Sequence, residues 1–343
     1  MNTPPATPEA AAAARPASPR ARAGRRGDNF RRQQARIGWG LSAPALVVVA
    51  AVTIFPIGYA IAMSVSNVSA TGSGFSLSGI TGSNYSIMFH AAEWRYALFF
   101  TVFYTAVTVA VEVVLGTLIA LVLERLAWGR GWMMALLLVP WSMITVINAQ
   151  LWGYIYNPTY GVLDDIFSHI GLGTPVFFGT RTPAIISLMI ADIWKTTPFV
   201  AIIVLAGLVM IPRDYFEAAA VDGAGGWRTF WKITFPQLRP TIALAVLFRV
   251  LQAFGLFDLP FVLTSGGPGY STQSLAILGY NAMFRDLDFG PGAAVATSTA
   301  LLVVIGCILF LKVFRAQAGT EGSLWLTRAR AGGGTGGAVS STA

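Results

Sequence analysis

Long apolar stretches alternate with polar segments along the 343-residue chain. Six of them reach the length of about 20 residues that a helix needs to cross the hydrocarbon layer of a membrane. They are Leu41–Val65, Tyr96–Leu123, Met133–Tyr156, Ala184–Ile211, Thr241–Leu263 and Ala293–Phe314. The pattern predicts an all-α, polytopic membrane protein with six transmembrane helices.

Prolines interrupt four of the six predicted spans, at Pro56, Pro140, Pro198 and Pro260. A proline within a span leaves a backbone carbonyl without its usual donor, which neighbouring helices or polar side chains must satisfy. We therefore expect the spans to pack against one another and not to act as single anchors.

Composition supports the membrane class. Of all residues 55% are hydrophobic and 11% are charged, whereas a soluble domain carries about 25% charged residues. The net charge of +8 can indicate nucleic-acid binding, but eight arginines lie before residue 37, where a membrane topology signal is the better interpretation. Cys307, the only cysteine, excludes an intrachain disulfide, and two histidines provide no zinc-binding spacing.

The polar ends set the predicted domain boundaries. Residues 1–37 are rich in Ala, Pro and Arg and are expected to be a disordered basic tail. A signal peptide is the alternative, but the apolar run that follows is too long for one. Residues 38–316 form the predicted six-span domain, with a core at about 94–315, and residues 317–343 form a second flexible tail.

The distribution of basic residues predicts the orientation. With the N-terminus inside, the inside segments hold 18 Lys and Arg residues, and the outside segments hold only Arg95, Arg181 and Arg285. Positive residues concentrate on the cytoplasmic side of membrane proteins. Both termini are therefore predicted to be cytoplasmic.

Three outside loops follow from this topology. Ser66–Arg95 is rich in Ser and Gly and is expected to be extended. Asn157–Pro183 contains apolar residues at helical spacing, which predict a short interfacial helix at Tyr160–Ile170. Thr264–Gly292 begins with a tight turn at Ser265–Gly269 and is expected to continue as a short helix through Tyr280.

A polar segment between the fourth and fifth spans, Glu217–Pro236, has the pattern of a helix–turn–helix hairpin. A helix-forming Glu-Ala-Ala-Ala run opens it, and glycines at 223, 225 and 226 permit a sharp turn. A second helix is expected from Trp227 to Ile233 and to stop at Pro236. Because Asp222, Arg228 and Lys232 have no place in a buried apolar helix, the hairpin is expected to project into the cytoplasm.

This hairpin resembles the EAA loop of ATP-binding-cassette importer permeases. The matching positions are Glu217-Ala218-Ala219, Gly223, Ile233 and Pro236. Two further stretches, Trp194–Pro198 and Ser265–Gly269, resemble the carbohydrate-uptake branch with its maltose- and trehalose-type permeases. The resemblance extends over roughly residues 40 to 315.

The resemblance implies that the hairpin docks on a separate ATPase and transmits its closure to the spans. The implied coupling residues are Glu217, Ala218, Ala219, Asp222, Gly223, Ile233 and Pro236. It also implies three kinds of partner: a second, similar permease, an ATPase dimer and an extracytoplasmic solute-binding protein. An ordinary amphipathic loop is the alternative interpretation of the hairpin.

Charged residues within spans are costly and face a partner or a wet cavity. The resemblance places a substrate path at the fourth and fifth spans. The residues predicted to line it are Asp192, Lys195, Thr196, Arg249, Gln252, Ala253 and Leu256. The alternative is structural pairing, of Asp192 with Lys195 or with Arg249. Glu112 and Asp258 are interpreted as structural, and Asn148, Gln150 and Trp152 are weaker candidates for the path.

The resemblance therefore predicts one half of the translocation pathway for a di- or oligosaccharide, with a polyol or glycerol-phosphate-type solute as the alternative. The chain lacks a phosphate-binding loop and is not expected to bind ATP, a metal or a cofactor. A secondary transporter or channel is a competing class, but coupling-ion sites and repeats are not evident. A membrane enzyme is disfavoured because no catalytic set of residues is evident.

The predicted topology can be tested with reporter fusions. Fusions after Gly72 and Gly173 should report the outside, and fusions after Gly129 and Gly225 should report the cytoplasm, because basic residues are retained on the inner side. An outside signal at Gly225 would contradict both the topology and the coupling role of the hairpin.

Overall fold

The structure, a computed structural model, describes residues 19–332 apart from residues 73, 127, 172 and 174. The chain divides into two compact units, residues 1–59 and 60–343, which are described separately. In the described part, four helices are long and apolar enough to cross a membrane, and the number rises to six if each of two bent helix pairs forms one span. By length and composition, this confirms the prediction of six spans.

The first unit consists of helix α1 (Pro19–Ser64) up to Tyr59. This helix begins well before the predicted span, so the expected disorder does not hold for residues 19–37. Ala and Arg are strong helix formers, and a low apolar content prevents a packed core without preventing a helix. Helix α13 (Phe289–Gly332) likewise continues past residue 316. The rest of the two predicted tails, 1–18 and 333–343, lies outside the described residues.

Three helices form the centre of the second unit. Helix α3 (Ala92–Arg125) packs along α7 (Arg181–Val209), and α10 (Phe235–Phe254) packs against both. Glycines allow close approach: a Cβ at Gly116 of α3 would lie 2.8 Å from Val200, and one at Gly207 of α7 would lie 2.5 Å from Thr241. Small residues at such crossings are the usual means by which membrane helices come into contact.

Two predicted spans are bent. The third consists of α4 (Arg130–Ser142) and α5 (Thr145–Ile155), which meet at 91°, and the fifth continues from α10 into α11 (Asp258–Thr264) at 45°. The interruption that Pro140 predicted within Met133–Tyr156 is confirmed, but the size of the bend was not predicted. Pro140, which cannot donate a backbone hydrogen bond, lies in the last turn of α4 and favours a break there.

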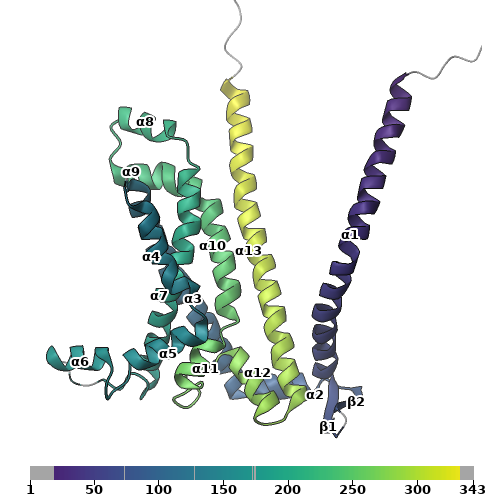
Figure 1. Ribbon diagram of the computed structural model, residues 1–343, viewed down its shortest axis with the longest axis vertical. Coiled ribbons are helices and arrows are strands. Elements are labelled where there is room, and N and C mark those ends of the chain that lie inside the picture. Colours follow the sequence, from purple (N-terminus) through teal and green to yellow (C-terminus); the bar gives the residue numbers. More distant parts are fainter. Residues whose placement is uncertain (1–18, 73, 127, 172, 174, 333–343) are drawn as a thin grey trace, which may run out of the picture. The chain divides into compact units, whose positions relative to one another are not determined.

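The three predicted outside loops gather at one end of the second unit (Figure 1). The first is an antiparallel hairpin of β1 (Ser66–Thr71) and β2 (Gly74–Ile80), followed by α2 (Ser83–His90), which the sequence did not predict. The other two contain α6 (Val162–His169) and α12 (Leu275–Phe284). These two helices confirm the short helices predicted for the second and third loops.

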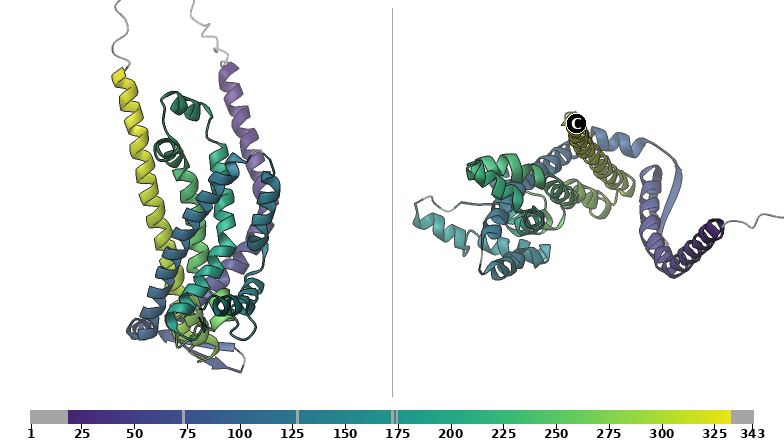
Figure 2. Two further views of the ribbon diagram at one scale, coloured as in Figure 1. Left: turned by 90° about the vertical axis from the view of Figure 1, so that its left-hand side faces the viewer. Right: turned by 90° about the horizontal axis from the view of Figure 1, so that it is seen from above.

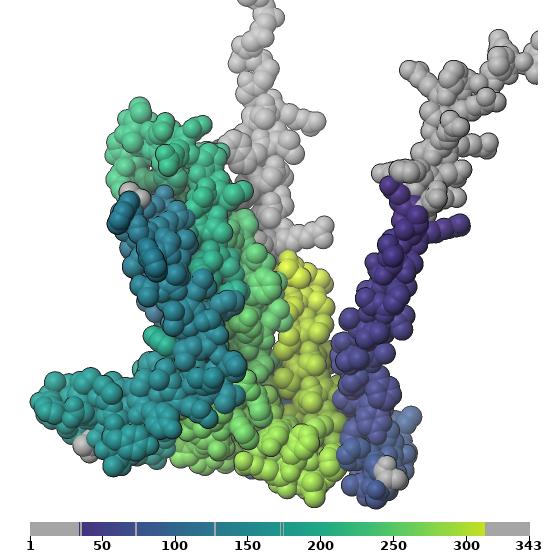
Figure 3. Space-filling view, in the orientation of Figure 1, coloured from purple at the N-terminus to yellow at the C-terminus, as the bar shows by residue number. Residues whose placement is uncertain are grey.

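The helix–turn–helix hairpin lies at the opposite end of this unit, where α8 (Asp214–Val221) and α9 (Gly226–Thr229) cross the ends of the long helices (Figures 1 and 2). It forms a knob on the surface of this end (Figure 3). The prediction of a hairpin is confirmed, but its second helix does not stop at Pro236. It continues through a π-helical turn, η1 (Phe230–Thr234), directly into α10. Proline is compatible with the first turn of a helix, where its missing N–H is not needed.

The close helix crossing can be tested by adding side-chain volume at Gly116. Gly116→Val should lower the melting temperature of the purified protein in detergent, because overpacking costs about 1–3 kcal/mol. Gly306→Val is the matched control, since that glycine also lies within a long helix and has nothing within 4 Å of its added Cβ. Equal melting temperatures for the two variants would contradict the crossing of α3 and α7.

Candidate functional site

A buried ion pair joins two of the central helices. The guanidinium of Arg249, on α10, donates from Nε to Oε2 of Glu112 at 2.5 Å and from Nη2 to Oε1 at 2.7 Å. Glu112 lies on α3, and the two side chains are 0% and 3% exposed. This two-point geometry matches the planar fork of arginine to both carboxylate oxygens and fixes the orientation of the pair.

Helix α7 contributes two further members to this cluster. The Thr196 hydroxyl lies 2.6 Å from Oε1 of Glu112, and Oδ2 of Asp192 accepts a hydrogen bond from Nη2 of Arg249 at 3.3 Å. Gln252, one turn along α10, accepts from Nη1 of Arg249 at 3.1 Å. One guanidinium therefore connects α3, α7 and α10.

Four of the seven predicted path residues meet in this cluster: Asp192, Thr196, Arg249 and Gln252. The alternative of an inter-span bond between Asp192 and Arg249 is present in the structure, whereas an Asp192–Lys195 ion pair is absent among the described residues. Because Arg249 donates two hydrogen bonds to the buried Glu112, the geometry favours structural pairing for Arg249. Glu112 was interpreted as structural, but its partner could not be read from the sequence.

The other three predicted path residues lie apart from the cluster. Lys195 is half-buried and donates to the Thr145 hydroxyl of α5 at 3.2 Å. Ala253 is buried. Leu256 follows the end of α10 and belongs to an apolar cluster with Phe100 and Leu188, so it is part of the core. Among the seven residues, Gln252 is exposed, Lys195 is partly exposed, and 13% of the Asp192 side chain is exposed.

Aromatic and amide groups lie on the elements beside these exposed residues. Trp194, next to Lys195 on α7, is exposed and contacts Trp152 of α5 edge-on, with ring centroids 5.8 Å apart. Asn148 of α5 is fully buried, and neither of its amide atoms has a hydrogen-bond partner within the described residues. Buried amides normally have hydrogen-bond partners. Asn148 is therefore a stronger candidate for the substrate path than the sequence alone indicates.

The turn of the hairpin depends on one glycine. Gly223 has a φ of +68°, which favours glycine because it has no Cβ. The N–H groups of Gly223 and Ala224 close the end of α8 by donating to the carbonyls of Ala220 and Ala219 at 3.1 and 2.9 Å. Gly225 has a φ of −66°, so glycine is not required there.

The predicted coupling residues are spread over the hairpin. Glu217, Ala218 and Asp222 are exposed, Ala219 is buried, and Ile233 and Pro236 are half-buried. Helix α8 begins at Asp214, three residues before Glu217, which was expected to begin the helix. Glu217 still lies in the first turn, where a negative charge is favourable.

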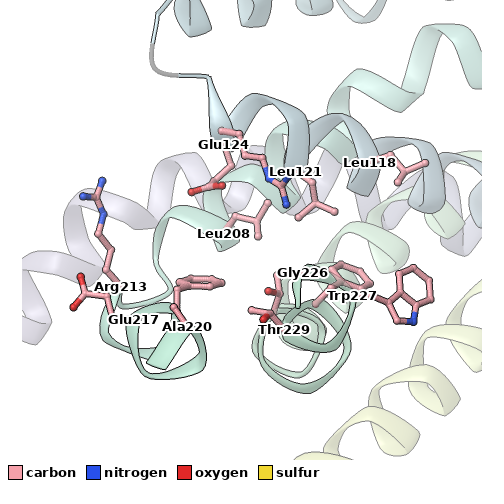
Figure 4. A pocket seen from close by; sticks show the side chains of 14 residues that line it. Leu118, Leu121, Glu124, Leu208, Arg213, Glu217, Ala220, Gly226, Trp227 and Thr229 are labelled. Carbon is pink, nitrogen blue, oxygen red and sulfur yellow. The ribbon is translucent and has the colours of Figure 1, made fainter. Parts of the chain in front are cut away.

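A cavity of about 840 Å³ separates the hairpin from the ends of α3 and α7. Leu118, Leu121 and Leu208 provide apolar lining from the long helices, and Glu124 and Arg125 add charge at the end of α3. Figure 4 shows Arg213 and Glu217 at one side of this cavity and Trp227 at the other. The hairpin is thus held by its connections to α7 and α10 and is only partly packed against the ends of α3 and α7.

Comparison with known proteins identifies related sequences over most of the chain. A sequence model of the family described as "Binding-protein-dependent transport system inner membrane component" matches residues 74–317. The trehalose/maltose transport system permease protein MalF of Thermococcus litoralis is 40% identical over 68% of this chain and 78% of its own length. The trehalose transport system permease protein SugA of Mycobacterium tuberculosis is 36% identical over 84% of this chain and 92% of its own.

A solved structure has the same fold. It is a bacterial ABC transporter involved in the import of the acidic polysaccharide alginate, and one of its chains aligns with a TM-score of 0.73 at 20% identity. The alignment covers 83% of this chain and 98% of the other. At this identity, the similarity shows the fold alone.

The buried pair generates a testable prediction about stability. Glu112→Ala should destabilise the protein by about 3–5 kcal/mol, because it leaves a buried guanidinium without its main partner. The double variant Glu112→Leu/Arg249→Leu should be less damaged than either single leucine variant, since it removes both charges together. Unfolding in detergent and abundance in membranes measure these effects. If the double variant is no better than the single variants, the two charges are not coupled.

Proposed function

The chain belongs to the family of binding-protein-dependent transport system inner-membrane components, and we propose that it is a permease subunit of an ATP-driven importer for a di- or oligosaccharide. It is a transport component and not an enzyme. The observation that carries the substrate class is the similarity, over most of the chain, to permeases named for trehalose and maltose. The chain would form half of the pathway, beside a second, similar permease.

A second candidate substrate is an anionic glycerol derivative. Two relatives from Agrobacterium fabrum support it, a sulfoquinovosyl glycerol permease that is 34% identical and an sn-glycerol-3-phosphate permease that is 30% identical. The partly exposed Lys195 supplies a cation beside the proposed path. The higher identities to the trehalose and maltose permeases favour the neutral sugar.

The proposed path lies beside the buried ion cluster and not through it. Asp192 and Gln252 are held by Arg249 at the edge of the cluster, where their remaining polar atoms can accept hydrogen bonds from sugar hydroxyls. The exposed ring of Trp194, on the same helix as Asp192, offers a flat apolar face. Arg249 positions these groups, and its own hydrogen-bonding capacity is largely taken up by Glu112, Asp192 and Gln252 together.

The hairpin is proposed to couple this path to ATP hydrolysis in a separate ATPase dimer. Its acidic first helix exposes Glu217 and Asp222 to a basic partner surface, and small Ala218 permits close approach. The hairpin is continuous with α10 through η1 and follows α7 after a short connection. A movement of the hairpin would therefore act on the two spans that carry the proposed path.

The proposed orientation places both termini and the hairpin in the cytoplasm. It is supported by the excess of basic residues in these segments. It is also supported by the fold, because the hairpin and the three other loops lie at opposite ends of the second unit (Figure 1). An extracytoplasmic binding protein would deliver the sugar at the end that carries α6 and α12.

The experiment that tests this function uses the complex reconstituted in vesicles with its binding protein. Binding protein loaded with trehalose or maltose should stimulate ATP hydrolysis and sugar uptake, whereas glycerol 3-phosphate should not. Stimulation by glycerol 3-phosphate alone would instead establish the second candidate.

In the same assay, two hairpin variants should uncouple transport. Glu217→Ala should weaken docking of the ATPase more than tenfold, since truncating one member of a desolvated charge pair costs about 2–5 kcal/mol. Gly223→Asp should have a similar effect, because its backbone must adopt a positive φ. Gly225→Ala is the matched control, with ordinary dihedrals and open space around its Cβ. If loaded binding protein stimulates ATP hydrolysis to the wild-type level in both Glu217→Ala and Gly223→Asp, the hairpin is an ordinary loop.

A further inference from the structure

The two limbs of the hairpin carry opposite charge. The first limb, from Asp214 to Asp222, contains three acidic residues and no basic one. The second limb, from Gly226 to Phe235, contains Arg228 and Lys232 and no acidic residue. Both basic side chains are exposed, and neither forms an ion pair within the described part of the chain. The two limbs therefore suit partners of different chemistry.

The second limb also exposes large aromatic side chains. Trp227 and Trp231 are 77% and 48% exposed, and their rings are in edge-on contact at 5.8 Å. Phe230 and Phe235 pack against Trp231 at 5.2 and 5.1 Å, which holds its ring in place. Because tryptophan combines an apolar body with a polar N–H, it is enriched where membrane meets water.

The position of the second limb in the fold agrees with a place at the boundary between membrane and water. It leads directly into α10, which belongs to one of the bent pairs that can form a span. Figure 1 shows α9 running across the end of α10 and not extending along its axis, and Figure 2 shows the same crossing from the side. A helix that crosses the end of a span stays at the depth of the headgroups, whereas an extension of the span would rise out of them.

The turn between α3 and α4 repeats this pattern. Trp128 and Trp132 are 94% and 80% exposed, and Arg125 lies three residues before the first of them. The cavity beneath the hairpin is lined by Arg125, the last residue of α3 before this turn, and by Trp227 from the hairpin, so the two segments lie at one end of the second unit. Exposed tryptophan next to arginine or lysine therefore recurs at this end.

We propose that the second limb of the hairpin lies in the headgroup layer of the cytoplasmic leaflet. Trp227 and Trp231 insert between the headgroups, and Arg228 and Lys232 bind the phosphate groups of anionic phospholipids. The assignment to the cytoplasmic leaflet rests on the proposed function. The first limb is left free for the ATPase, and the lipid-bound second limb gives the hairpin a fixed base against which the first limb moves.

The test measures contact with lipid directly in the complete complex. The complex is placed in nanodiscs whose phosphatidylglycerol carries bromine on its acyl chains, or in discs with the bromine on phosphatidylcholine instead. Bromine should quench more tryptophan fluorescence in the wild type than in Trp227→Phe/Trp231→Phe, and the difference should be larger with brominated phosphatidylglycerol. No ATP or sugar is added, so the outcome does not depend on transport.

Charge variants test the choice of lipid. A basic residue near an anionic surface contributes about a fivefold preference, so Arg228→Gln/Lys232→Gln should lower the preference for phosphatidylglycerol by about 25-fold. Arg228→Lys/Lys232→Arg keeps both charges and should retain it. If the double phenylalanine variant is quenched as much as the wild type, or if the glutamine variant releases the ATPase with unchanged quenching, this face contacts protein and the proposal is wrong.

Discussion

The arrangement of the central spans depends on the pair between Arg249 and Glu112. Neither charge can be left alone in a low-dielectric interior, because desolvating an unpaired ion costs several kcal/mol. Apolar packing within a membrane is weakly directional, since lipid chains are as apolar as leucine. Along the helices, the pair falls between one apolar cluster around Val204 and Leu238 and another around Tyr104 and Leu188. It therefore fixes the register of α3, α7 and α10, which packing alone would leave less defined.

The same pair explains why the polar groups of the proposed path are close together. Asp192 comes from α7 and Gln252 from α10, and each is held by a different nitrogen of Arg249. The two limbs of the hairpin are attached to these same helices, α7 through a short connection and α10 through η1. A force on the hairpin therefore reaches the helices that carry the proposed path, and the guanidinium limits how far they can separate. The coupling proposed above would therefore be a joint shift of these two linked spans.

The sequence predicted the features that follow from local rules. Apolar length located the six spans, and the glycines predicted the hairpin turn, with a positive φ at Gly223. The sequence did not predict the 91° bend between α4 and α5, because Pro140 indicates a weak point and not an angle. It also could not assign Glu112 to Arg249, since partners on different helices leave no spacing signal. From Pro236 the sequence wrongly predicted the end of a helix. Proline is found both after the end of a helix and in its first turn, so the local pattern does not distinguish the two.

The hairpin combines two requirements that a single helix could not meet. The proposed docking on a soluble ATPase requires a surface that can release and rebind, which suits the exposed charges of Glu217 and Asp222. A lever must also have a fixed base, which suits the aromatic and basic second limb. Gly223 separates the two limbs by a turn that other residues adopt only with strain. The cavity beneath the hairpin is lined by residues of both limbs and of α3 and α7, so the hairpin is only partly packed against these spans. In the proposed arrangement, contact with lipid keeps the second limb in place while the acidic limb follows the ATPase.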